Sequence, residues 1–220
     1  MTKSFMKALV LAASLVALFA VPAAAQIHSI DYVGYGWTTG GPTKAIGDGF
    51  DFVGVADYVD PVFGVNLAAE ELTFHVYGLL VVSEVDLGGT LMVTYSGGYM
   101  EIYQDGAMNA DWGINPPNLT APATFADGSL FFAGEFTDMT MFVFPSGGGN
   151  FEGNLNGIAG TMIDGSCTGC VYTWGGAFST DAGAQIPEGY GLQVDGVLEI
   201  DAAVSVDQAA WGSVKALYNN

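Results

Sequence analysis

Short runs of β-forming residues, each ended by glycine, proline, asparagine or aspartate, follow one another along the chain after residue 26. The longest run, residues 72–85 (LTFHVYGLLVVSEV), alternates at first and then becomes apolar on both faces. That pattern is typical of a strand covered on both sides. Many short strands with turn residues between them indicate an all-β sandwich or barrel. We therefore expect a single-domain antiparallel β-sandwich, with a jelly roll as one possible form.

The turn residues predict how these strands connect. Ser96-Gly97-Gly98 predicts a hairpin between strands at 90–95 and 99–104, and Asp195-Gly196 predicts another between 190–194 and 197–200. Residues 105–126 contain adjacent prolines, which cannot donate to a sheet ladder, so a long loop is expected there. A second loop is expected at 178–189. Because long loops are often functional, we expect a ligand to bind at these two loops.

The two ends of the chain differ from this β pattern. Residues 1–25 combine a basic start, an apolar run and small residues up to Ala25, which predicts a secretory signal peptide cleaved near that residue. The apolar run is shorter than the ~20 residues of a membrane-spanning helix. The β domain is expected at 26–206, and helical spacing at 207–220 predicts a short C-terminal helix or a frayed tail. We therefore expect a secreted protein, either extracellular or periplasmic.

The charge of the chain limits its partners. It contains 23 acidic residues against 4 lysines and arginines, for a formal net charge of −19 at pH 7. Such a chain cannot make the basic contacts that nucleic-acid binding needs, and it is repelled by anionic membrane surfaces. Cations and neutral ligands such as glycans or extracellular matrix components remain as partners. The default explanation for the charge is solubility.

The two cysteines, Cys167 and Cys170, lie between β-type segments. A secretory context favours a structural disulfide between them, which would hold a tight turn. A thioredoxin-like redox pair needs an α/β unit that this pattern lacks, and a metal site needs further ligands. Free thiols are the remaining alternative.

Catalytic and metal motifs are weak. His28 and His75 are the only histidines, and no Gly-x-Ser-x-Gly elbow is present. Paired carboxylates, as in glycosidases, cannot be recognised among so many acids. Asp-Gly steps could supply calcium ligands but are also common turn residues, so no cofactor is expected and calcium stays an alternative. These steps begin at Asp48, Asp105, Asp127, Asp164 and Asp195.

Aromatic residues in or near the expected loops are the best ligand-binding candidates. We select Trp112, Trp37 and Tyr103, because exposed rings can stack on sugars, although aromatic residues more often pack in cores. The expected function is that of a secreted non-catalytic surface, matrix or binding protein, with carbohydrate binding as its sharper form. The alternatives are a secreted glycan-active enzyme with paired carboxylates and a small outer-membrane β-barrel.

Overall fold

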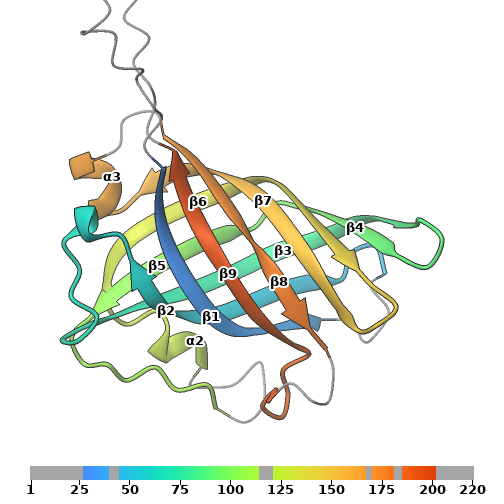
Figure 1. Cartoon of the computed structure of the whole chain (residues 1–220), viewed down its shortest axis with the longest axis horizontal. Helices are drawn as coiled ribbons and strands as arrows, with labels where there is room; N and C mark the ends of the chain where they lie inside the picture. Colours follow the sequence, from blue (N-terminus) through green and yellow to red (C-terminus); the bar gives the residue numbers. More distant parts are fainter. Residues whose placement is uncertain (1–26, 40–44, 114–120, 167–169, 181–184, 202–220) are drawn as a thin grey trace, which may run out of the picture. The chain divides into compact units, whose positions relative to one another are not determined.

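A closed antiparallel sheet forms the body of the protein in a computed structural model, which describes residues 27–39, 45–113, 121–166, 170–180 and 185–201 (Figure 1). Its strands are β1 (Ile27–Thr39), β2 (Gly49–Val59), β3 (Glu71–Asp86), β4 (Leu91–Ser96), β5 (Tyr99–Asp105), β6 (Ser129–Val143), β7 (Gly148–Ala159), β8 (Val171–Ser179) and β9 (Leu192–Asp201). Three short helices lie in the connections: η1 (Pro61–Phe63), α2 (Ala121–Thr124) and α3 (Thr161–Ser166).

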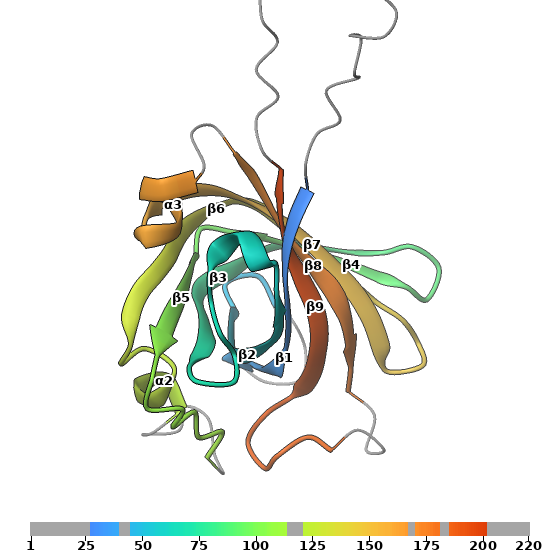
Figure 2. The same ribbon diagram turned by 60° about the vertical axis from the view of Figure 1, so that its left-hand side comes forward.

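The sheet closes because β9 pairs with β1. The other strands of the described ranges pair with their neighbours in sequence, except that β4 does not pair with β5. Both β4 and β5 pair with β3 on one side and with β6 on the other, so the strands form an 8-strand barrel (Figure 2). The all-β class is therefore confirmed. The expected two-layer sandwich is wrong, because a single sheet closes on itself.

Two predicted hairpins are also wrong, because their glycines lie along a strand path that does not reverse. β4 and β5 run in one direction along β3, and Gly97 and Gly98, with φ of 68° and 85°, interrupt a single path instead of reversing it. Gly196 lies inside β9, opposite Tyr32 and Gly176. A side chain at Gly196 would collide with the Tyr32 hydroxyl and the Gly175 carbonyl. This glycine therefore allows close packing within the barrel and makes no turn.

The long run at 72–85 changes its inward face at a β-bulge. Leu72, Phe74 and Val76 are buried, and the buried positions then shift to Leu79 and Val81. Gly78, with φ of 76°, lies between the two sets, where the pairing with β2 also shifts register. Such a bulge inserts an extra residue and redirects the side chains that follow. The two apolar faces seen in the sequence are thus successive inward faces, and residues such as Leu80, 49% exposed, point outward.

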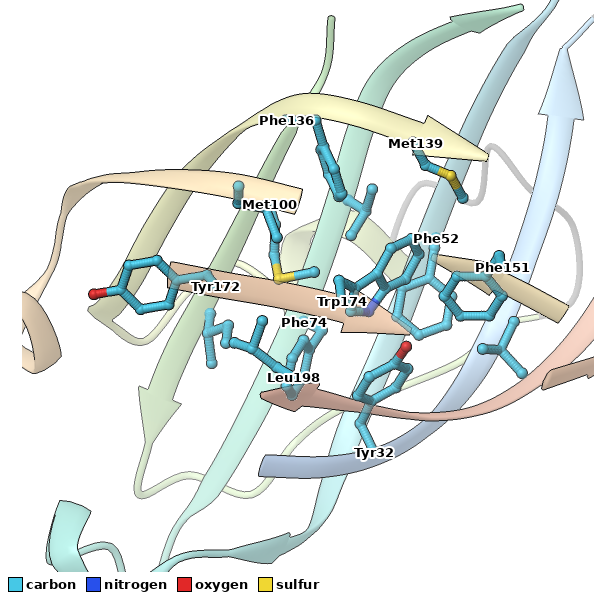
Figure 3. Packing of buried hydrophobic residues seen from close by; sticks show 14 of the residues in the cluster. Tyr32, Phe52, Phe74, Met100, Phe136, Met139, Phe151, Tyr172, Trp174 and Leu198 are labelled. Atoms are coloured by element: carbon cyan, nitrogen blue, oxygen red, sulfur yellow. The ribbon is translucent and has the colours of Figure 1, made fainter. Parts of the chain in front are cut away.

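Aromatic side chains fill the barrel interior (Figure 3). Trp174 is fully buried, and its ring lies 4.5 Å from Phe151 and 5.6 Å from both Phe52 and Phe136, measured between centroids. The Tyr32 ring stacks on its other side at 6.0 Å. An eight-stranded barrel is just wide enough for side chains to fill. The interior is therefore a packed core.

Two connections add apolar residues at the end of the barrel where β1 begins. The segment between β2 and β3, which carries η1, packs its side chains against the core, and α3 between β7 and β8 does the same. The residues involved are Phe63, Val65, Leu67, Met162 and Ile163. These side chains extend the packed interior at this end of the barrel.

Several sequence predictions fall on residues that the structure does not describe. The signal peptide at 1–25, the helix at 207–220 and Cys167 lie outside the described ranges. Cys170 is not a free thiol, but its pairing with Cys167 stays a prediction. Within the described segments, no helix has the length and apolar character needed to cross a membrane.

Candidate functional site

A groove of about 540 Å³ lies on the outer face of the barrel over β4, β6 and β7. Its apolar part comes from Met92, Phe142 and Phe144. Strand register places Met92 directly opposite Phe142, and Val85 of β3 lies opposite Met92 on the other side. Phe144 is 40% exposed, so part of its ring is available to a ligand. Phe151, which is buried, also lines the groove.

Polar side chains line the rest of the groove. Thr140 and Glu152 are cross-strand partners, and Asn150 lies opposite Phe142. Asp138 also faces the groove, and its carboxylate accepts hydrogen bonds from Asn154 Nδ2 at 3.0 and 3.3 Å. These contacts hold Asp138 in one orientation. The groove therefore offers hydroxyl, amide and carboxylate groups beside two aromatic rings.

Trp37 and Trp112, both predicted ligand-binding residues, come together in a second aromatic cluster. Trp37 is 7% exposed and lies on the outer face of β1, with its ring 5.6 Å from Tyr190. The Trp112 ring lies 4.9 Å from both Tyr35 and Phe125, and the Tyr190 hydroxyl donates to the Trp112 carbonyl. These rings pack the connection between β5 and β6 onto the barrel wall. Their role in ligand binding stays a prediction.

Tyr103, the third predicted binding residue, lies in a different cluster on β3 and β5. Its hydroxyl donates to Glu101 Oε2 at 2.8 Å, and the Tyr77 hydroxyl donates to Glu101 Oε1 at 3.2 Å. Burial raises the pKa of Tyr103 to about 12, and the contact with Glu101 adds to the shift. The hydroxyl of Tyr103 therefore stays protonated and serves as a donor. The structure does not bring Tyr103 together with Trp37 and Trp112.

His75 belongs to the Tyr103 cluster. It lies directly opposite Glu101, and its ring is 4.7 Å from that of Tyr77. Burial lowers the pKa of His75, while the charges of Glu101 and Asp51 oppose that shift. Burial also raises the pKa of Asp51, whose Oδ1 accepts a 3.1 Å bond from the Gly78 N–H. Sequence analysis missed the His75–Glu101 pair, because the predicted hairpin at Gly97-Gly98 hides the long β3–β5 pairing.

Two of the Asp-Gly steps act as turn residues. Asp48 Oδ2 accepts a 2.8 Å bond from the Ala45 N–H, and Asp105 Oδ1 accepts a 2.9 Å bond from the Ala107 N–H. Aspartates commonly hydrogen-bond to the backbone of their own turn in this way. Among the residues that the structure describes, no group of three or more histidine, cysteine or acidic residues could hold a metal ion. Calcium binding stays untested.

Comparison of the chain with protein-family models, with curated proteins and with solved structures finds no match. Any functional argument therefore depends on the geometry of the chain itself. The groove over β4, β6 and β7 combines open space with both apolar and polar ligand-binding groups.

Proposed function

We propose that this chain is a non-catalytic binding protein that binds a neutral glycan in the groove over β4, β6 and β7. One observation carries the proposal: Phe142 and Phe144 lie beside outward-facing polar groups on paired strands. The apolar face of a sugar ring can lie on such aromatic rings. The hydroxyl groups around its edge can bond to Asp138, Asn150 and Glu152. At about 540 Å³, the groove is within the size range of small-ligand sites.

Charge favours a neutral ligand over an acidic polysaccharide. All four lysines of the chain lie outside the described ranges, and the chain has no arginine. Within those ranges, positive charge can come only from histidine. An anionic ligand at this groove would meet Asp138 and Glu152 without a compensating cation.

The direction of the barrel side chains also supports a binding role in an aqueous setting. Apolar rings such as Trp174 and Phe52 point inward, whereas acidic residues such as Glu152 point outward. A barrel in the outer membrane requires an uninterrupted apolar band facing lipid, whereas here charged residues such as Glu152 and Asp138 interrupt the apolar residues of the outer face. This contrast favours the binding protein over the outer-membrane alternative.

A glycan-active enzyme is the second candidate, because Asp138 and Glu152 face the same groove. Glycosidases use two carboxylates on either side of the bond that they cleave. Release of reducing sugar by the wild-type protein, lost in Glu152→Gln, would replace the binding proposal with this one.

The direct test is an array of neutral and acidic glycans probed with the wild-type protein and a Phe142→Ala/Phe144→Ala variant. Loss of both rings should weaken binding about tenfold, which corresponds to roughly 1.4 kcal/mol. Tyr58→Ala is the matched control, because Tyr58 is an exposed aromatic residue outside the groove. Trp112→Ala tests the alternative aromatic site. Equal binding by wild type and the double variant, or no glycan bound at all, would contradict the proposal.

A further inference from the structure

The hairpin of β3 and β4 projects from the barrel (Figures 1 and 2) and leaves part of β3 open at one edge. The pairing between β2 and β3 reaches only to Gly49 and Leu80. Two further backbone bonds join Val81 to Gly47 and Asp48. Beyond Val81, β3 pairs with β4 on one side, and no strand in the described ranges pairs with residues 82–86 on the other.

Backbone groups of this segment face away from β4. In an antiparallel ladder, opposite residues alternate between hydrogen-bonded and non-hydrogen-bonded pairs. The Leu87 N–H donates to the Thr90 carbonyl, which makes this the first bonded pair of the hairpin. Asp86 opposite Leu91 and Glu84 opposite Val93 are then non-bonded pairs. Their N–H and C=O groups consequently point to the open edge.

The side chains around this edge are apolar and acidic. Val82, Val85 and Leu87 are 45%, 41% and 56% exposed. Glu84 and Asp86 are exposed between them. An open edge with exposed apolar residues can pair with another extended chain, and its charges decide which chain.

Charge disfavours a second copy of this chain as the occupant. Two such edges paired together would bring Glu84 and Asp86 of one copy against the same residues of the other. Like charges facing each other across a strand pair are destabilising. A basic strand would instead place its cations against these carboxylates.

We propose that the β3 edge at residues 82–86 binds an extended basic segment of a partner protein by β-strand addition. The backbone of Glu84 and Asp86 supplies the ladder bonds, and their carboxylates select lysine or arginine on the incoming strand. Val82 and Val85 contact its apolar residues. The groove residues of β6 and β7 are not part of this edge, so the inference does not depend on glycan binding.

The test is fluorescence anisotropy with a labelled peptide of alternating lysine and valine. The wild-type protein should bind this peptide, and added salt should weaken the binding because exposed charges are screened. The same peptide with N-methylated backbone amides is the matched control, since it keeps the charge but lacks the N–H donors of a ladder. An alternating glutamate and valine peptide should not bind.

Variants at Glu84 distinguish the contribution of its backbone N–H to peptide binding from that of its carboxylate. Glu84→Pro removes an N–H that faces the open edge and no bond to β4, so it should abolish binding and keep the fold. Glu84→Gln keeps the N–H and should weaken binding only in part. Reversing one charge with Glu84→Lys should weaken binding of the lysine–valine peptide and strengthen binding of the acidic peptide. Asp86 is kept, because its Oδ1 accepts bonds of 2.8 and 2.7 Å from the Gly88 and Gly89 N–H groups of the turn.

Hydrogen exchange on the wild-type protein gives a readout that does not depend on any variant. Addition of the lysine–valine peptide should slow exchange of the Glu84 and Asp86 amides. Unchanged exchange at both amides, or equal binding of the N-methylated peptide, would overturn the proposal. Concentration-dependent dimerisation that protects the same amides would overturn it in favour of a second copy as the occupant.

Discussion

The Glu71 carboxylate accepts a 2.7 Å hydrogen bond from the backbone N–H of Asn109. The same oxygen accepts a 3.0 Å bond from the Ala110 N–H. Glu71 is 8% exposed, so both bonds are largely shielded from water. They fix the start of the β5–β6 connection, which goes on to place Trp112 against Tyr35.

Glu71→Ala should therefore destabilise the protein by about 3 kcal/mol, because it leaves two backbone donors without their charged acceptor. The free energy of unfolding in urea measures this loss, and hydrogen exchange should show faster exchange at Asn109 and Ala110. Glu71→Gln is the control: it keeps one acceptor oxygen and should cost less. A Glu71→Ala protein as stable as wild type would show that the connection is held by its aromatic contacts alone.

Substitution of Trp174 in the core should strongly lower the free energy of unfolding. Its ring contacts four other aromatic rings, so Trp174→Ala should cost about 3–5 kcal/mol. Its buried Nε1 has no hydrogen-bond partner within the described part of the chain. Trp174→Phe removes that unsatisfied donor and should cost clearly less than the alanine variant. Urea unfolding compares the two, with Val171→Ala, at an exposed position of the same strand, as control. Equal losses for phenylalanine and alanine would contradict this reasoning.

The sequence allowed the β class to be predicted but not the connections. Asp195-Gly196 matches a hairpin turn, yet Gly196 lies inside β9, where the nearby Tyr32 hydroxyl leaves no room for a side chain. A glycine needed for a turn and a glycine needed for close packing look the same in sequence. Closure of the barrel depends on pairing Ile27 with Asp201, and no local pattern reports a contact over that separation.

The candidate site was missed for a related reason. The ligand-binding prediction favours tryptophans in expected loops. In the structure, however, β1 extends to Thr39, and Trp37 is buried on the outer face of this strand. Phe142 and Phe144 of the groove alternate with Met141 and Val143, so both faces of that segment look apolar in the sequence. Only the register with β7, which places Asn150 opposite Phe142, identifies the outward face.

Close packing at Gly196 gives a third prediction. An added methyl group there would collide with the Tyr32 hydroxyl, which donates a 3.3 Å bond to the Gly175 carbonyl. Gly196→Ala should therefore lower the free energy of unfolding by about 1–3 kcal/mol, the usual cost of overpacking. Gly106→Ala is the matched control, since a Cβ at Gly106 meets no atom within 4 Å. If both variants unfold at the same urea concentration as wild type, the strand pair around Gly196 is looser than the structure indicates.

The burial of His75 predicts how the stability of the protein depends on pH. Burial lowers its pKa in the folded state below the ordinary value of 6.5, despite the opposing charges of Glu101 and Asp51. Between the folded pKa and 6.5, the unfolded chain therefore binds more protons than the folded chain. The His75 contribution to stability is fully present above 6.5 and is lost as the pH falls through this window.

His75→Gln should remove this contribution and flatten the dependence of the unfolding free energy on pH just below 6.5. Urea unfolding of both proteins across that range measures the slopes. His28→Gln is the control for the other histidine, which bonds to Asp60 at 2.9 Å outside this cluster. If His75→Gln keeps the full wild-type slope, the explanation based on His75 burial is wrong.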